Sequence, residues 1–339
     1  MNTAVVYISS DSYVKQTGTS IYSLFENNRH IKRLDTYVIS TGITQKNKKK
    51  LRSVAAEFQR KMEILDGQDL IAEICSRGGV KYFGSYVLWI RPMVPEVIPS
   101  FYDVLIMIDG DTLVLDEISK LINKTYHMSE EKVVLMARNS DNDRIRKKYG
   151  LRPEDISVNP GVMCINMKNW KKHRCTERLL SFMEHHDITK YKTLDEVAYS
   201  KVLKKEICAA DFNEIYYPCY RDLTGRQLLF MYHLNPEHYY SIQEIENAKG
   251  HEVILHYVNL LGHPWEKGCL CPLSGLWEKY YKRAWKREIN KVNPVKKGAC
   301  RKVILVSYKN FRWLYVFIYR VWYGLVPYFN IDGRNDGIK

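Results

Sequence analysis

Short runs of hydrophobic residues alternate with helix-like segments along the first part of the chain. The runs Thr3–Ser9, Leu34–Ser40 and Met62–Leu65 have the length of strands. Between them, Thr17–Phe25 has apolar residues at helical spacing, and Thr44–Phe58 is basic with the alanine and leucine typical of a helix. Alternating strands and helices are typical of a parallel sheet covered by helices. The pattern therefore predicts an α/β fold with a doubly wound sheet.

The run Val104–Ile108 is apolar on both faces, like a strand buried inside a parallel sheet. Asp109-Gly110-Asp111 follows directly, and then a second apolar run, Thr112–Leu115. Open α/β sheets bind ligands at the carboxyl ends of strands, and a glycine there lets the backbone come close to a ligand. Two neighbouring carboxylates would repel unless a cation lay between them, and Mg²⁺ and Mn²⁺ prefer such oxygens. The motif predicts a metal site, with a solvated turn between two strands as the alternative.

Two earlier segments carry candidate ligand-binding residues. The turn after the first strand (SSDSY) lacks the G-x-G-x-x-G of dinucleotide-binding folds, but Asp11 could hold a base or ribose and the Tyr13 ring could stack on a base. The alternative is a capped turn. Ser85–Met93 has the pattern of a helix end, and Arg91 is its one charged residue. A partly buried arginine needs an anionic partner, for which the nearby aspartates or a phosphate would serve.

Later segments add further candidates. Arg138–Leu151 is dense in charge and predicts a surface loop or a short basic helix. Asn159 lies in an Asn-Pro-Gly turn that leads into an apolar strand, where it could contact a sugar hydroxyl. Asp195 and Glu196 lie near the start of a predicted helix, a position that the helix dipole favours for carboxylates. His256 ends an apolar run, and a histidine at a strand end is a candidate ligand in a chain with an acidic metal motif.

Composition points to anionic partners. The chain has 52 Lys+Arg against 38 Asp+Glu and a net charge of +14, which suits nucleotide phosphates, nucleic acid or an anionic membrane. The start, MNTAVVYISS, has no secretory pattern, so we expect a reducing cytosol and free thiols for the eight cysteines. Cys269-x-Cys271 has no second pair at zinc-ligand spacing, and no stretch has the length of a membrane-spanning helix without charges.

The character of the chain changes after Lys282. Arg283–Lys302 reads as a basic linker, and Val303–Phe329 mixes aromatic rings with arginine and lysine. Cations at this spacing argue against a spanning helix, whereas rings and cations together suit a helix lying on an anionic membrane surface. The alternative is a helix packed on the catalytic domain. We favour membrane contact, because so many rings and cations would be hard to bury together.

Six segments, in this order, resemble one family: the retaining nucleotide-sugar glycosyltransferases of family 8, which have the GT-A fold. The segments are SSDSY, SYVLWIR, IDGDTLVL, VNPGVMCINMKNW, LDEVAYS and HYVNLLGHPW, between Thr3 and Tyr281. The family includes bacterial lipopolysaccharide α-galactosyl- and α-glucosyltransferases. The resemblance implies a Rossmann-like, mixed but mostly parallel sheet flanked by helices over residues 1–282. The basic aromatic C-terminal helical extension over residues 283–339 is expected from its composition and lies outside the resemblance.

The resemblance also implies a metal and a donor. Asp109, Asp111 and His256 would hold Mn²⁺ (or Mg²⁺) against the diphosphate of a UDP-sugar. The residues that would contact this donor beside the two aspartates are Ser10, Asp11, Tyr13, Arg91, Gly110, Gly161, Gly262 and His263.

Asn159, Asp195 and Glu196 would be the catalytic residues beside the transferred hexose. The family usually has glutamine where this chain has Glu196, which suggests either a nucleophile or a surface helix residue. Where the family usually has two acidic residues before an asparagine, this chain has Asp11 between Ser10 and Ser12. Where the family usually has a lysine, this chain has His263.

The expected activity is metal-dependent, retaining transfer of galactose or glucose from a UDP-sugar to a lipopolysaccharide, capsular or lipid-linked glycan. We expect it on the cytoplasmic face of a bacterial membrane, with no nucleic acid bound beyond the nucleotide sugar. Three alternatives remain open: a glycogenin-like, self-glucosylating initiator, a catalytically silent sugar-binding relative, and a nucleic-acid-binding protein. The last predicts clustered basic residues beside stacking aromatics and no metal site.

Overall fold

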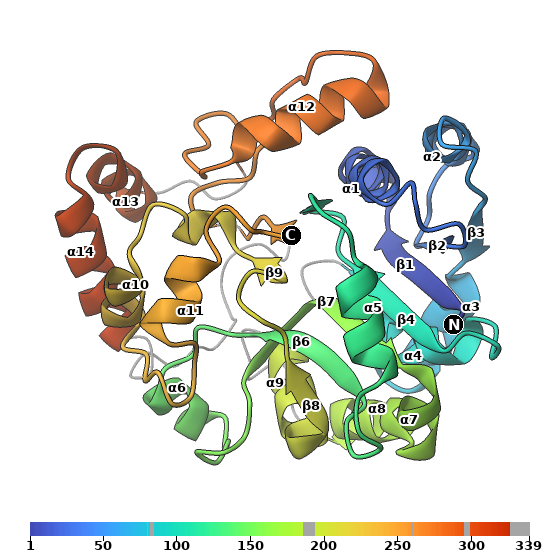
Figure 1. Ribbon diagram of the computed structural model, residues 1–339, viewed down its shortest axis with the longest axis horizontal. Coiled ribbons are helices and arrows are strands. Elements are labelled where there is room, and N and C mark those ends of the chain that lie inside the picture. Colours follow the sequence, from blue (N-terminus) through green and yellow to red (C-terminus); the bar gives the residue numbers. More distant parts are fainter. Residues whose placement is uncertain (80, 82–84, 186–193, 259, 295–298, 326–339) are drawn as a thin grey trace.

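The computed structural model describes residues 1–79, 81, 85–185, 194–258, 260–294 and 299–325, and a seven-stranded sheet lies at its centre (Figure 1). The strand order is β3-β2-β1-β4-β7-β6-β8. These strands are β1 (Thr3–Ser9), β2 (Asp35–Ser40), β3 (Met62–Asp66), β4 (Val104–Ile108), β6 (Val134–Arg138), β7 (Val158–Asn166) and β8 (Ile207–Ala209). Among the described strands of this sheet, only β7 runs antiparallel to its neighbours. The prediction of a mixed, mostly parallel sheet is confirmed.

Helices cover both faces of the sheet, which explains why β1 and β4 are apolar on both sides (Figure 1). The helices of one face are α1 (Val14–Asn27), α2 (Gln45–Ala56) and α5 (Ser119–Tyr126), and α12 (Ser274–Trp285) packs on α1. Those of the other face are α3 (Gln68–Ser76), α4 (Val87–Val97), α7 (Met167–Lys172), α8 (Cys175–His185) and α9 (Leu194–Leu203). Each face has its own hydrophobic core, and the sheet separates the two cores.

The α4 segment differs from its prediction. The sequence pattern indicated a helix end at Ser85–Met93, but the helix begins at Val87 and continues to Val97 with Pro92 and Pro95 inside it. Each proline removes a backbone donor and would weaken an isolated helix. Burial of its residues from Trp89 to Pro95 holds the segment helical in the folded protein.

A second, three-stranded sheet brings the late histidine to the aspartates. Its order is β5-β10-β9, and its strands are β5 (Thr112–Val114), β9 (Ile215–Tyr216) and β10 (Ile254–His256). In the antiparallel pair β5–β10, His256 lies opposite Thr112. The strand after the aspartate motif therefore fixes the position of the histidine.

The charged segment Arg138–Leu151 contains a short helix, α6 (Asp143–Lys148), which agrees with the second of the two predicted alternatives. The Asn142 side chain caps it by accepting from the Ile145 amide at 3.1 Å. Arg146 is buried and donates to the carbonyls of Pro153 and Asp155, each at 2.7 Å. The segment is thus anchored to the domain by one of its own cations.

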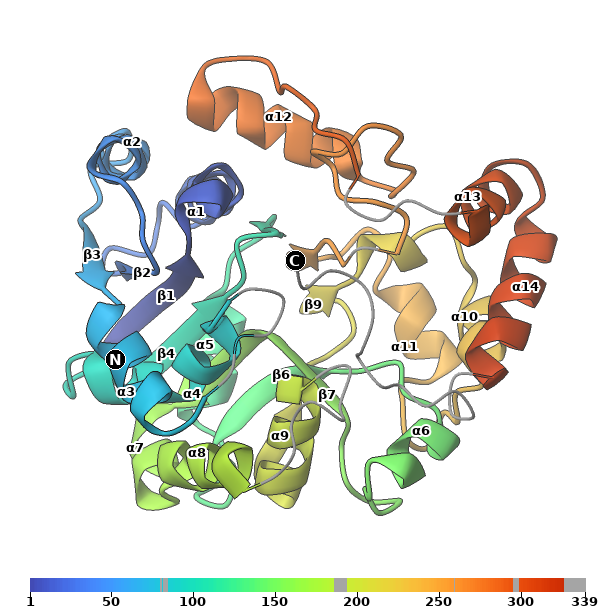
Figure 2. The ribbon, with the colours of Figure 1, turned by 180° about the vertical axis from the view of Figure 1, so that it is seen from behind.

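The C-terminal helices pack side by side on the region that follows the main sheet (Figures 1 and 2). They are α10 (Gly225–Tyr232), α11 (Ile242–Asn247), α13 (Ala299–Asn310) and α14 (Arg312–Leu325). Elsewhere in the chain, short 3-10 turns occur at Asp11–Tyr13, Lys204–Glu206 and Pro218–Tyr220. Tyr308, Tyr315 and Tyr319 are buried against the domain. The opposite face leaves Trp313 and Phe317 exposed, so α14 has one face packed on the protein and one open to its surroundings.

All seven cysteines whose surroundings the structure describes are free thiols, as predicted. Burial raises the pKa of both Cys164 and Cys175 to about 12, so these two thiols remain protonated at neutral pH.

Among the described helices, none combines the length and apolarity that a bilayer span requires.

Candidate active site

The Asp109-Gly110-Asp111 turn follows the carboxyl end of the central strand β4. The Asp109 amide donates to the Gly161 carbonyl of β7 at 2.8 Å, and the Thr112 hydroxyl donates to the Asp109 carbonyl at 2.8 Å. A Cβ on Gly110 would lie 2.6 Å from Thr17 Oγ1 and 3.0 Å from the Tyr13 ring. Glycine is therefore required here because the turn passes close to the start of α1, in addition to any ligand that it approaches.

Asp109, Asp111 and His256 form a possible metal site. One ligand atom from each of them lies within 4.8 Å of the others, and His256 Nε2 is 3.5 Å from Asp111 Oδ1. Within the described part of the chain, His256 Nδ1 is buried without a hydrogen-bond partner. Two carboxylates and one imidazole suit a divalent cation, so these residues fit the metal that the sequence predicts.

Gly161 makes room for the histidine. A Cβ at this position would lie 2.2 Å from His256 Cε1 and 2.8 Å from His256 Nδ1. Its amide also donates to Asn159 Oδ1 at 3.0 Å. The glycine in the Asn-Pro-Gly turn therefore serves the imidazole and the neighbouring asparagine at once.

Electrostatic interactions couple the three possible metal ligands. Burial raises the pKa of Asp109, with Arg91 opposing and Asp111 adding to this shift. Burial also disfavours the Asp111 carboxylate, but His256 outweighs it and lowers the Asp111 pKa. In the same pair, burial lowers the pKa of His256 and Asp111 more than compensates, so the net shift is upward. A cation between the two carboxylates would relieve their mutual repulsion.

Arg91 of α4 links the aspartate motif to α9. It is buried, donates to Asp109 Oδ1 at 2.7 Å, and forms a hydrogen-bonded ion pair with Asp195. Burial would lower the Arg91 pKa, but the two carboxylates raise it, so the guanidinium stays charged. The ion pairs agree with the prediction that Arg91 needs acidic partners, and they place Asp195 beside the metal motif.

Glu196, the next residue of α9, accepts hydrogen bonds from two asparagine side chains. Asn159 Nδ2 donates to its Oε1 at 2.9 Å, and Asn139 Nδ2 donates to its Oε2 at 2.8 Å. The asparagines lie on β7 and just after β6, respectively. The structure therefore brings Asn159, Asp195 and Glu196 together next to the aspartates.

The turn after β1 lies at the same edge of the sheet. Asp11 Oδ1 accepts from the Thr44 amide at 2.8 Å and from Asn47 Nδ2 at 2.9 Å, and the amide hydrogen bond lowers the Asp11 pKa. These bonds tie the turn to the start of α2, whose own N-cap is Thr44. The Ser10 and Ser12 hydroxyls are hydrogen-bonded at 3.1 Å.

Tyr13 and the late loop meet beside the aspartate turn. The Tyr13 ring packs edge-on against Trp265 at 5.9 Å, and burial together with Asp111 and Asp109 raises its pKa. His263 stacks on Trp265 at 4.5 Å, and burial lowers the His263 pKa, which favours the neutral imidazole. Gly262 has a φ of 91°, a left-handed conformation that favours glycine. This loop offers an aromatic surface with little positive charge.

Sequence reasoning missed several residues of this region. Asn139 could have been found as a polar residue after the apolar strand β6. Tyr217, whose ring centroid lies 5.7 Å from that of His256, has no motif around it. Tyr323 of α14 donates to the Ser140 carbonyl at 2.9 Å across 183 positions of sequence. No local signal could have predicted that contact.

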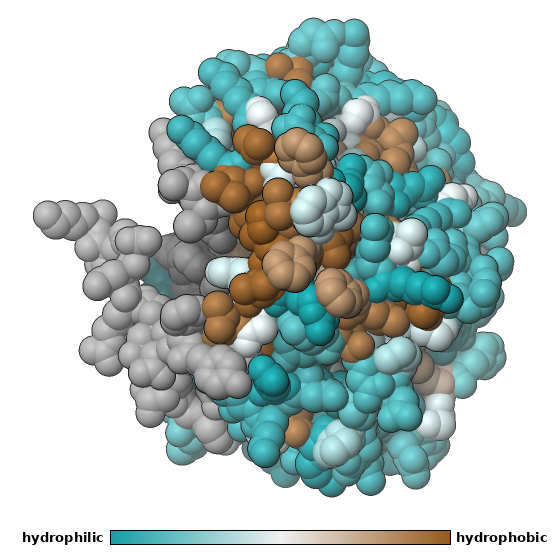
Figure 3. Space-filling model, turned by 90° about the vertical axis from the view of Figure 1, so that its left-hand side faces the viewer, coloured by the Kyte–Doolittle hydropathy of each residue, from teal (hydrophilic) through white to brown (hydrophobic). Residues whose placement is uncertain are grey.

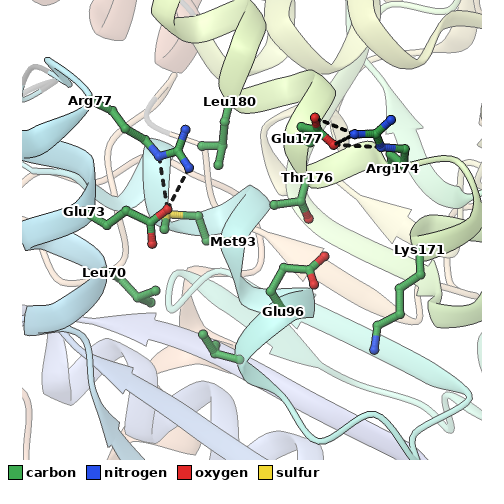
Figure 4. Close-up of a pocket in the computed structure, with 11 residues that line it drawn as sticks. Leu70, Glu73, Arg77, Met93, Glu96, Lys171, Arg174, Thr176, Glu177 and Leu180 are labelled. Atoms are coloured by element: carbon green, nitrogen blue, oxygen red, sulfur yellow. Dashed lines mark hydrogen bonds and ion pairs between the residues drawn. The ribbon is translucent and has the colours of Figure 1, made fainter.

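A groove of about 570 Å³ lies between α3, α4 and the segment from α7 to α8 (Figure 4). Its charges include the ion pairs Arg77–Glu73 and Arg174–Glu177. None of the predicted site residues lines it. The candidate site is therefore the polar cluster at the strand ends, which is distinct from this groove.

Comparison with known proteins points to one family. Residues 4–269 match the family model described as "Glycosyl transferase family 8". General stress protein A of Bacillus subtilis (strain 168) is 26% identical over 201 residues, which are 59% of this chain and 68% of the relative. Lipopolysaccharide 1,2-glucosyltransferase of Escherichia coli (strain K12) is 25% identical over 207 residues, which are 59% of this chain and 58% of the relative. The chain thus spans only part of these curated relatives.

A solved structure extends the comparison to the fold. The galactosyltransferase LgtC, in complex with donor and acceptor sugar analogs, superposes with a TM-score of 0.64 at 15% identity, over 88% of this chain and 99% of that chain. This likeness shows that the two proteins share the GT-A fold.

Proposed function

The chain belongs to glycosyltransferase family 8, and from this premise we propose that it transfers galactose or glucose from a UDP-sugar to a glycan or glycolipid, with retention of configuration. The observation that carries the proposal is the convergence of Asp109, Asp111 and His256 beside Arg91 and Glu196. These residues come from distant parts of the sequence, so their proximity is a property of the fold. This combination of metal ligands, a cation and polar groups at one sheet edge suits a nucleotide-sugar donor.

The proposed cofactor is Mn²⁺ or Mg²⁺, held by Asp109, Asp111 and His256. When bound, the metal supplies positive charge that stabilises the departing diphosphate. Arg91 holds Asp109 and Asp195 in place through its two ion pairs. Because the guanidinium is buried and already paired with carboxylates, its main effect is to orient those groups, and the diphosphate charge is left to the metal.

Asp11, Ser10 and Tyr13 are proposed to hold the uridine. Asp11 uses one oxygen to bind Thr44 and Asn47 at the start of α2, so its other oxygen is the candidate contact to the ribose or base. Close packing around the donor site is permitted by Gly110 and Gly161. A left-handed turn there is permitted by Gly262. The neutral His263, stacked on Trp265, offers a hydrogen-bonding group in place of a lysine charge.

Asn159, Asp195 and Glu196 are proposed to face the hexose. Carbon–oxygen cleavage leaves the anomeric carbon electron-poor, so a nearby carboxylate or amide oxygen stabilises the transition state more than the ground state. Asp195 is held by Arg91, and Glu196 by two amides. Both carboxylates are thus fixed before the substrate binds, which is the condition for efficient electrostatic stabilisation.

The acceptor is proposed to be a lipopolysaccharide, capsular or lipid-linked glycan at the cytoplasmic face of a bacterial membrane. The lipopolysaccharide glucosyltransferase among the relatives supports this class of acceptor. Hydrophobic side chains gather on the face over α13 and α14 (Figure 3). The exposed members include Val303, Val306, Phe311, Trp313 and Phe317. Together with the net charge of +14, this face suits an anionic membrane surface.

The proposal is tested by a donor hydrolysis screen, because slow hydrolysis of a nucleotide sugar needs no acceptor. The purified protein is incubated with UDP-glucose, UDP-galactose and other nucleotide sugars, with Mn²⁺ or with EDTA. We expect UDP release from one UDP-hexose that depends on the metal. The absence of hydrolysis would contradict the proposed function, and UDP binding without hydrolysis would then indicate a silent relative.

A further inference from the structure

We propose that Asn139 is a positioning residue for Glu196, and that the residues at 139 and 196 form a pair matched in hydrogen-bond polarity. The inference rests on the proposed function, because Glu196 is assigned there to the hexose. It goes further by explaining how this chain accommodates a glutamate where its family usually has glutamine. Two hydrogen bonds reach the Glu196 carboxylate, and two backbone hydrogen bonds orient the asparagines that donate them.

Backbone amides fix the orientation of both asparagine side chains. Asn139 Oδ1 accepts from the Ser140 amide at 3.0 Å, and Asn159 Oδ1 accepts from the Gly161 amide at 3.0 Å. Since the oxygen of each side-chain amide is used in this way, its NH₂ group must point in the other direction. Both NH₂ groups point at Glu196, at 2.8 Å for Asn139 and 2.9 Å for Asn159.

Residue 196 therefore has to accept a hydrogen bond on each side. A carboxylate does so, because both of its oxygens are acceptors. A glutamine offers one acceptor and one donor, so one of the two asparagines would face it donor to donor. Rotating that asparagine would only transfer the conflict to the Ser140 or Gly161 amide. A donor left without an acceptor in this partly buried cluster is costly, so Glu196 is the residue that these two asparagines specify.

Asn139 is itself held by its neighbours. Its Nδ2 also lies 3.2 Å from Asp141 Oδ2, and the Ser157 hydroxyl donates to the same Asp141 oxygen at 2.6 Å. Tyr323 of α14 donates to the Ser140 carbonyl at 2.9 Å, next in sequence to Asn139. The position of Asn139 is thus set by β6, by the start of β7 and by the C-terminal helix, which gives Glu196 a rigid support.

The test is a double-mutant cycle of Glu196→Gln, Asn139→Asp and the two combined, read by donor hydrolysis and by thermal unfolding. In the combined variant, the carboxylate at 139 accepts from the amide at 196, and the amide oxygen at 196 accepts from Asn159. We expect Glu196→Gln alone to lower kcat about tenfold, with KM for the UDP-sugar changed less than about threefold. The combined variant should recover kcat to within about threefold of the wild type.

Thermal unfolding provides a readout that does not depend on activity. Glu196→Gln should lower the unfolding midpoint by about 2 °C, and the combined variant should recover it. The cycle is repeated with Asp141→Asn added to the wild type, to each single variant and to the combined variant. This change removes the repulsion between a carboxylate at position 139 and Asp141. Asn247→Asp, an exposed change of the same type on α11, is the matched control and should leave kcat and the midpoint unchanged.

The two proposals fail in different ways. If the wild type hydrolyses no UDP-sugar, the proposed function is wrong, and the unfolding cycle still measures the coupling between positions 139 and 196. If the wild type is active, the pairing proposal is overturned when the combined variant is no better than Glu196→Gln in kcat and in unfolding midpoint, with and without Asp141→Asn.

Discussion

Single residues in this site have more than one task, and glycines show this most clearly. Gly110 lets the aspartate turn pass close to Thr17 and Tyr13, and Gly161 leaves room for the His256 ring. Metal affinity should therefore depend on positions that carry no ligand atom. Two predictions separate the ligands from the residues that make space for them.

Asp111→Asn should weaken Mn²⁺-dependent binding of UDP by at least about a hundredfold, since a carboxylate ligand is replaced by a neutral amide. The fold should be retained, because the Asp111 carboxylate lies at the edge of the site and its ion pair is with His256, another residue of the site. Calorimetric titration of UDP with Mn²⁺ measures the effect. Asp116→Asn, an exposed aspartate just after β5, is the control. Unchanged UDP affinity in Asp111→Asn would contradict the metal assignment.

Gly161→Ala should also weaken Mn²⁺ binding, because the added Cβ would lie 2.2 Å from His256 Cε1 and must displace the ring. Gly275→Ala is the matched control, since a Cβ there meets nothing within 4 Å. That change, in α12, should be neutral or slightly stabilising. Manganese titration of both variants decides the matter, and equal affinities would show that His256 is no ligand.

At the scale of elements, α14 docks beside a partly buried carboxyl group. Tyr323 of α14 lies next to Asp141, and burial raises the Asp141 pKa above its ordinary value of 3.8, against opposing hydrogen bonds from Ser157 and others. The stability associated with protonated Asp141 is complete below the ordinary pKa and is lost as pH rises through the raised, folded-state pKa. The packing of a C-terminal helix is thus linked to pH.

Asp141→Asn should remove this dependence. The free energy of unfolding of the variant, relative to the wild type, should increase as pH rises from about 4 to about 7, because only the wild type has to ionise a partly buried carboxyl group there. Urea unfolding at several pH values measures the difference. The exposed Asp116→Asn should show a flat difference over the same range, and an equally flat difference for Asp141→Asn would contradict the prediction.

At the scale of the whole molecule, positive charge and an apolar face occur together. The chain carries +14, and the face of α14 that points away from the domain exposes Trp313 and Phe317. Because Tyr315 and Tyr319 of α14 and Tyr308 of α13 are buried against the domain, truncating this region would uncover core residues. Substitutions on the exposed face are therefore a cleaner test of membrane contact than a deletion.

The variant Trp313→Ser with Phe317→Ser should bind anionic vesicles more weakly than the wild type, and salt should weaken both proteins because exposed charges are screened. The exposed fractions of Trp313 and Phe317 are 69% and 54%, so the fold should tolerate both changes. Phe101→Ser with Tyr126→Ser, at 52% and 42% exposure, is the matched control away from this face. Vesicle co-sedimentation measures binding, and equal loss in both double variants would contradict the membrane proposal.

The sequence by itself determined the elements and the chemical types of the site residues. Runs such as Val104–Ile108 predicted a buried strand, because apolar periodicity is a local property that survives in the fold. It also placed two carboxylates at that strand's end and indicated Arg91 and His256 as their partners. It was wrong about the end of α4, where tertiary burial holds two prolines in a helix.

Only the tertiary structure decided which of these residues meet. Arg91 reaches Asp195 across 104 positions, Asn139 reaches Glu196 across 57, and Tyr323 reaches Ser140 across 183. Such contacts depend on strand order, on the reversal of β7 and on the register of β10 against β5, none of which leaves a periodic signal in the sequence. Spacing along the chain predicts which side chains can share one face of an element, whereas packing between distant elements decides which faces come together.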